Sequence, residues 1–200
     1  MDRTSKFMTD HSEGDKGKEA VMDFQISWVL RMAADEDYTK DKPIFRLYSK
    51  FMLLKLLEMP LPNSVQIKKV RVWKEWENID LCVEVELERN KETEYHFILI
   101  ENKVYTKKMN TLQRDNYPDT LKQYYDNCPD KKNYKPHFVL ITCAEKDEDI
   151  VHLKAFCANA EKETKWNVLS IYDIILDLDI ETESELFNEF WIYNWGRLTD

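Results

Sequence analysis

Glycine is scarce in this chain, which has only three glycines among its 200 residues. Gly14, Gly17 and Gly196 lie near the two ends, and none of them follows a predicted strand. A Walker loop and a dinucleotide-binding turn both need glycines directly after a strand, because their backbone amides must approach phosphates closely. The sequence therefore excludes the two commonest nucleotide-binding designs.

Cysteine pairs and long apolar runs are missing as well. The chain has four cysteines without a Cys-x-x-Cys motif, which favours buried free thiols in a reducing cytoplasm. Its four histidines show no zinc-ligand spacing. No segment approaches the roughly 20 apolar residues that cross a bilayer, and the first residues lack the apolar core of a secretory signal. We therefore expect a cytoplasmic protein without a membrane partner.

Basic residues are fewer than acidic ones: the chain has 29 lysines and arginines and 38 aspartates and glutamates, and its net charge is −9. A protein that coats nucleic acid non-specifically usually has a basic balance, so that class is disfavoured. Local basic strips can still bind a polyanion. Three strips occur, each equally compatible with solvated surface: Lys68, Lys69, Arg71 and Lys74; Lys107, Lys108 and Arg114; Lys131, Lys132 and Lys135.

Two tryptophans, Trp73 and Trp76, lie beside the first basic strip. An exposed indole ring there could stack on a nucleic-acid base. Tryptophan packs more commonly in the core or at its rim. The sequence alone leaves both roles open.

Composition and length predict a globular fold with a real core. The hydrophobic fraction is 43% and the aromatic fraction 12%, which is typical of a folded domain of this size. Residues 1–18 are polar and contain two glycines, so we predict a flexible leader there. We predict one domain over residues 19–200.

Apolar periodicity predicts a mixed α/β fold in the order α-β-β-β-α-β with further helices. Helices are expected at 19–34, 43–59, 120–127, 147–160, 172–178 and 183–195. Strands are expected at 65–76, 79–87, 95–104, 137–142 and 168–171. The first three strands are joined by short turns and should form an antiparallel meander. Residues 35–42 form a charged connection, and Pro118 is expected to precede its helix.

The end of the third predicted strand is the most informative segment of the chain. Four apolar residues, 97–100, run directly into Glu101, Asn102 and Lys103. Residues two apart on a strand share a face, so Glu101 and Lys103 point to the same side. Either the strand leaves the core there and the two charges form an exposed pair that contributes little to stability, or the two side chains interact with another charged or polar group.

Asp80, at the start of the second strand, supplies a partner for this pair. Adjacent strands lie about 4.8 Å apart, so Asp80 and Glu101 can approach each other. Two carboxylates can hold a divalent cation that acidifies a water and polarises a phosphoryl oxygen. Lys103 could orient that water or stabilise the transition state, and the Asn102 carbonyl could complete the coordination.

Asp80, a spacer and an apolar strand ending in Glu101-Asn102-Lys103 resemble the PD-(D/E)xK nuclease superfamily. Its members include restriction endonucleases, repair nucleases and many uncharacterised bacterial proteins. The resemblance covers residues 19 to 142 and implies a restriction-endonuclease-like αβββαβ core with extra N- and C-terminal helices. It also implies DNA as the substrate and Mg²⁺, with Mn²⁺ as a substitute, bound by Asp80, Glu101 and Asn102. Lys103 would be the catalytic cation.

Further superfamily features are matched less closely. The helix after the lysine strand often carries a glutamine and a tyrosine, for which Gln123 and Tyr124 are the candidates, although Thr120 stands in the usual glutamine position. The residue before the aspartate is usually proline and is Ile79 here. An acid on the first helix or the preceding strand is also common. Its candidates are Glu19, Asp23, Glu75 and Glu77, and Glu75 is the one we select.

The sequence thus predicts a metal-dependent nuclease that hydrolyses DNA in defence or repair. The alternative is a catalytically silent module of the same fold that binds nucleic acid or a protein. A third interpretation is a structural or regulatory protein that forms a homodimer or binds a partner through aromatic C-terminal helices. The aromatic residues concerned are Phe187, Phe190, Trp191, Tyr193 and Trp195. We expect them to cap the core, and an exposed remainder would instead indicate a dimer face.

Overall fold

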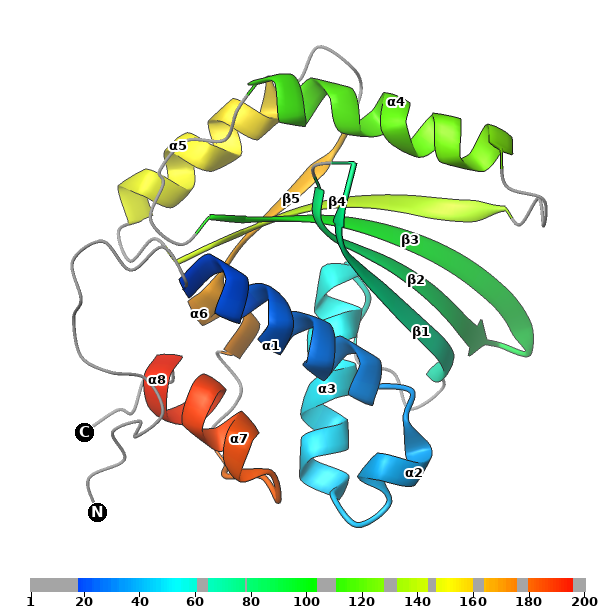
Figure 1. Ribbon diagram of the computed structural model, residues 1–200, viewed down its shortest axis with the longest axis vertical. Coiled ribbons are helices and arrows are strands. Elements are labelled where there is room, and N and C mark those ends of the chain that lie inside the picture. The colour runs from blue at the N-terminus through cyan, green and yellow to red at the C-terminus, as the bar shows by residue number, and fades with distance from the viewer. Residues whose placement is uncertain are drawn as a thin grey trace.

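The protein forms a five-stranded mixed sheet with helices on both faces, which confirms the α/β prediction (Figure 1). The computed structural model describes residues 18–60, 65–77, 79–103, 111–127, 133–143, 147–159, 164–175 and 180–195. The strand order is β1-β2-β3-β4-β5, with antiparallel pairing from β1 to β3 and parallel pairing from β3 to β5. The strands are β1 (Val65–Trp76), β2 (Ile79–Arg89), β3 (Glu92–Lys103), β4 (Tyr134–Thr142) and β5 (Trp166–Ser170).

The helices follow the expected order with shifted ends. They are α1 (Lys18–Met32), α2 (Glu36–Thr39), α3 (Pro43–Leu56), α4 (Thr111–Asn127), α5 (Asp147–Ala158), α6 (Ile171–Ile175), α7 (Glu185–Phe187), the π-helix η1 (Asn188–Ile192) and α8 (Tyr193–Trp195). The short helix α2 lies inside the segment expected to be a connection. None of the helices within these described ranges is long and apolar enough to span a membrane. The predicted leader, apart from Lys18, lies outside the described residues, as do Lys107, Lys108, Lys131, Lys132 and Cys128.

Each face of the sheet has its own core. On one face, α1, α3, α6 and the C-terminal helices cover the sheet, and we call this packing the α1-side core (Figure 1). On the other face, α4 and α5 cover it and form the α4-side core. Both faces of β3 are therefore buried, as expected for a strand with a continuous apolar run.

A β-bulge in β1 changes which of its side chains face the core. The register with β2 shifts between Ile67 and Lys69, so one residue is inserted there. Ile67 therefore faces the α1-side core together with Val70 and Val72. Simple alternation along residues 65–76 predicts that Ile67 shares a face with Arg71, and this prediction is wrong because alternation does not anticipate the inserted residue.

The helix α4 begins nine residues before its predicted start and contains Pro118 in its interior. We expected Pro118 to precede the helix, because an internal proline removes one backbone hydrogen bond. Tyr117, Leu121 and Tyr124 recur at spacings of four and three residues and face the sheet. Their burial against the α4-side core outweighs the local cost of the proline.

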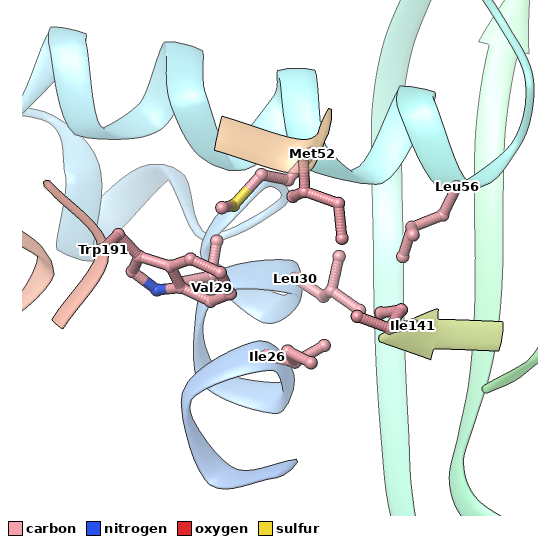
Figure 2. A pocket seen from close by; sticks show the side chains of 8 residues that line it. Ile26, Val29, Leu30, Met52, Leu56, Ile141 and Trp191 are labelled. Carbon is pink, nitrogen blue, oxygen red and sulfur yellow. The ribbon is translucent and has the colours of Figure 1, made fainter. Parts of the chain in front are cut away.

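The C-terminal aromatic residues mainly complete the α1-side core. Phe187, Phe190 and Trp191 are buried, and Trp195 is partly buried against the same core. The Trp191 ring lines a small apolar pocket to which α1, α3 and β4 also contribute (Figure 2). The lining residues are Ile26, Val29, Leu30, Met52, Leu56, Ile141, Ile174 and Trp191. This confirms the expectation that the C-terminal aromatics cap the core.

A carboxylate from the C-terminal segment caps the start of α3. The residue before α3, Lys42, provides no side-chain cap. Instead, the backbone N–H groups of Ile44 and Phe45 donate to the two oxygens of Glu183, at 3.2 and 3.1 Å. Slight burial alone would raise the pKa of Glu183, but these backbone hydrogen bonds lower it below the usual value.

Replacing this cap should destabilise the fold in a pH-dependent way. We expect Glu183→Gln to lower the free energy of unfolding by about 1 kcal/mol at pH 7, as loss of a charged helix cap does. Because the pKa of Glu183 is lowered, its contribution is present above the unfolded-state pKa and is lost as the carboxyl protonates in acid. Urea unfolding at pH 7 and pH 3 measures both, with exposed Glu92→Gln as control. Equal losses for the two variants would contradict the capping role.

Candidate active site

The predicted site carboxylates lie where the pairing of β2 with β3 ends. The last paired residues are Leu81 and Ile100, so Asp80 and Glu101 come immediately after the ladder. Beyond that point β3 continues to pair with β4 as far as Lys103. The separation of β2 from β3 leaves the two carboxylates between strands that no longer bond to each other.

The packing of Ile79 also shows that β2 separates from β3 at this point. Strict alternation predicts that Ile79 faces the same side as Leu81, but Ile79 packs in the α4-side core and Leu81 in the α1-side core. The end of β2 has left β3, and the hairpin between β1 and β2 lies close under α4 (Figure 1). This departure from the expected pattern occurs at Asp80 itself.

Glu101 is a fully buried carboxylate whose two oxygens are both engaged. Its exposed fraction is 0%, and the Lys103 ammonium donates to Oε1 as an ion pair. The Tyr117 hydroxyl from α4 donates to Oε2. Burying an unpaired carboxylate is very costly, so these two donors are what make the position tolerable. Glu101 and Lys103 do share a face, as their spacing predicts.

Asp80 is held by the backbone of β3. The Asn102 N–H donates to Oδ2 of Asp80 at 2.7 Å. The side chain of Asn102 points to the opposite layer, where its Nδ2 donates to Oδ1 of Asp23 on α1 at 2.5 Å. Lys74 of β1 lies 3.6 Å from Asp23. A chain of polar contacts therefore runs from Asp80 through Asn102 to the first helix.

The two carboxylates influence each other electrostatically. Burial raises the pKa of Asp80 to about 7, and the negative charge of Glu101 adds to this rise. The Asn102 hydrogen bond and the Lys103 charge act in the opposite direction but do not cancel it. The pKa of Tyr117 is also raised, by burial and by Glu101, so its hydroxyl keeps its proton and remains a donor.

Three other predicted site residues lie away from Glu101 or outside the described residues. Gln123 is exposed on α4, roughly 200° around the helix from buried Leu121 at about 100° per residue. Tyr124 donates to Glu84 at 2.8 Å and does not take the position next to Glu101. The side chain of Glu75 lies outside the described residues, and so does that of Trp76.

Tyr117 and Asp23 are the site residues that sequence reasoning missed or passed over. The helix expected from residue 120 leaves out Tyr117, although the spacing of four residues to Leu121 and of three more to Tyr124 is the signal that places it on the buried face. Asp23 is one of the four candidate acids, but the sequence favours Glu75. Only the fold brings Asp23 to Asn102, 79 residues away in sequence.

The chemistry of the acidic pair suits a hard divalent cation. Among the described residues, no group of three or more His, Cys, Asp or Glu side chains is arranged to hold a metal ion. Asp80 and Glu101 nevertheless lie close enough for one charge to raise the pKa of the other, and a cation between them would relieve that repulsion. Mg²⁺ commonly takes only one or two protein carboxylates and keeps several waters or phosphate oxygens.

The raised pKa of Asp80 predicts a pH-dependent stability penalty. An unfolded aspartate titrates near pH 4 and the folded one near 7, so between these values the folded state holds a proton that the unfolded state has lost. Stability should therefore fall as pH rises through this window. We expect the melting temperature of Asp80→Asn, measured against that of the parent, to rise between pH 5 and pH 8. Exposed Asp126→Asn is the control, and a constant difference would contradict the prediction.

Comparison with known proteins returned no relative. No family model, no curated protein and no solved structure matches this chain.

Proposed function

We propose that the protein is a metal-dependent nuclease of the PD-(D/E)xK type that hydrolyses phosphodiester bonds of DNA. The observation that carries the proposal is the buried carboxylate of Glu101, paired with Lys103 on the same strand and placed beside Asp80. A structural role needs no such arrangement, because apolar residues at these positions would pack at lower cost. A nuclease of this kind would serve DNA defence or repair.

The order of the elements supports the same proposal. A helical layer precedes three antiparallel strands, a helix follows them, and the next strand pairs in parallel with the third. This order agrees with a restriction-endonuclease-like αβββαβ core. The appended β5 and the C-terminal helices complete the sheet and the α1-side core.

Each proposed site residue has a defined task. Asp80 and Glu101 would hold Mg²⁺, with the Asn102 carbonyl as a further candidate ligand, and the bound ion would acidify a water and neutralise phosphate charge. The Tyr117 hydroxyl orients Glu101, and the Asn102 N–H orients Asp80.

Lys103 is poised to change partners. Its side chain is 15% exposed, so the ammonium can leave Glu101 for a substrate phosphate. A positive group that moves onto the phosphate would stabilise the charge that develops there. Without a cation, the same lysine neutralises Glu101 and keeps the buried carboxylate tolerable.

The alternative is a silent module that keeps this fold and binds nucleic acid or a protein. One observation favours it: both oxygens of Glu101 are already engaged by Lys103 and Tyr117. In a silent module this would be the permanent state. In a nuclease, a cation can replace the lysine.

A metal titration separates these two possibilities. We expect isothermal titration with Mn²⁺ to give one site per chain, and Asp80→Asn to weaken it at least tenfold, because half of the carboxylate set is lost. Lys103→Ala should bind Mn²⁺ as well as the parent or better, since the competing ammonium is gone. Asp126→Asn on α4 serves as the matched control. A parent chain that binds no Mn²⁺ would favour the silent module.

A cleavage assay tests the catalytic role of Lys103. The parent should cut DNA with Mg²⁺ and not with EDTA, on a panel of linear duplex, circular duplex and single-stranded substrates. Removing one electrostatic stabiliser commonly costs about 10²- to 10³-fold in rate, so Lys103→Ala should lose at least 100-fold. Lys122→Ala, an exposed lysine on α4, should cut normally. Full activity in Lys103→Ala would refute the mechanism.

A further inference from the structure

Three exposed side chains form a row along the edge strand β1. They are Lys69, Arg71 and Trp73, which we call the β1 row. The three residues share a face because positions two apart on a strand point the same way. The bulge between Ile67 and Lys69 makes this face the one opposite to Ile67. Among the described strands β1 is the first of the sheet, so the row lies on an edge strand.

The β1 row lies on the face of the sheet that carries Glu101. Trp73 stacks on Phe97 of β3, with ring centroids 6.3 Å apart and an interplanar angle of 18°. Phe97 is an even number of residues before Glu101, so the two share a face. Trp73 is also paired with Cys82, which stands only two residues from Asp80. Two residues of strand span about 6.8 Å, so the row leads directly toward the carboxylates.

The ring of Trp73 is available for a flat apolar ligand. One side of the indole is against Phe97, and 38% of the residue remains exposed. Phe97 in turn packs against Tyr124 and Tyr134, so the ring stands on a rigid aromatic base. A supported ring of this kind needs no ordering before it stacks on a base.

The cations of the row retain capacity for phosphate. The Arg71 side chain is 56% exposed, and its contact with Glu84 is long, at 3.9 Å. Glu84 already accepts hydrogen bonds from Tyr124 and Tyr134, at 2.8 and 3.1 Å. A loose exposed ion pair contributes little, so a phosphate can compete for the guanidinium. Lys69 extends the positive charge one step further along the strand.

We propose that the β1 row binds single-stranded nucleic acid, with a base stacked on Trp73 and an adjacent phosphate on Arg71, and leads the strand to Asp80 and Glu101. This inference rests on the proposed nuclease function and names its substrate class. A duplex keeps its base faces stacked inside, so an exposed indole cannot use them. Duplex binders also neutralise several phosphates over a broad basic surface, and an acidic chain with two row cations does not fit that pattern.

Fluorescence anisotropy of a labelled 12-residue oligothymidine tests the proposal. The chain is used with EDTA, where no metal-dependent cleavage occurs and Lys103 keeps Glu101 neutralised. Base stacking on an aromatic side chain is worth about 1–3 kcal/mol, so Trp73→Ala should weaken binding by about 5- to 150-fold. Trp73→Phe should bind within about threefold of the parent. Tyr38→Ala is the matched control, because Tyr38 is also an exposed aromatic but lies on α2, away from the β1–β2 hairpin (Figure 1).

A second variant keeps the test independent of any folding defect at Trp73. Arg71→Ala changes only an exposed side chain and should weaken binding while lowering the slope of log K against log salt concentration by about 0.7, as one lost phosphate contact on a single strand does. Circular dichroism checks that each variant is folded. The inference is overturned if a 12-base-pair duplex binds more tightly than the single strand, or if Trp73→Ala and Arg71→Ala both bind like the parent.

The experiments distinguish a failure of the single-strand proposal from a failure of the proposed nuclease function. Metal-dependent, Lys103-dependent cleavage of duplex DNA without single-strand binding would overturn this inference and leave the nuclease standing. Trp73-dependent single-strand binding without any cleavage would refute the nuclease and retain the binding row. Neither binding nor cleavage would refute both.

Discussion

The burial of one negative charge, on Glu101, constrains much of the surrounding structure. Water cannot solvate this carboxylate, so its compensation must come from Lys103 and Tyr117. Breaking a buried ion pair by removing one partner typically costs about 3–5 kcal/mol. Lys103 is supplied by the strand itself, but Tyr117 arrives only when α4 docks on the sheet. The hydrogen bond from Tyr117 to Glu101 therefore constrains where α4 and its aromatic side chains pack on the sheet.

Strict alternation on β3 divides the Glu101-Asn102-Lys103 segment between two layers. Glu101 and Lys103 face α4, whereas the Asn102 side chain faces α1 and meets Asp23. The backbone N–H of Asn102 still donates to Asp80. Asn102 therefore connects α1, on one face of the sheet, to the carboxylate of Asp80 next to Glu101. The site is therefore sensitive to how both layers pack, although Asp80, Glu101 and Lys103 come from only two strands.

Local patterns predicted the strands well because each strand is long and its pattern is simple. The bounds of β1 were correct, and the meander of three strands was confirmed. Local patterns failed where tertiary packing outweighed propensity. Pro118 suggested a helix start, yet burial of Tyr117 and Leu121 carries α4 through it. The pairing of Glu101 with Lys103 was visible from spacing alone, whereas the approach of Asp23 to Asn102 depends on how α1 crosses the sheet.

The bulge in β1 confines the irregularity of the strand to a single residue. Lys68 is the residue that the register of β1 with β2 passes over, and its side chain is exposed. Exchanging it for another polar residue changes little. Deleting it would restore uninterrupted alternation back to Val65, with Ile67 and Val70 still facing the core and Arg71 and Trp73 still on the opposite face. The strand should therefore tolerate a frame-preserving loss of this codon as well as a polar substitution there, because neither change turns an apolar side chain away from the core.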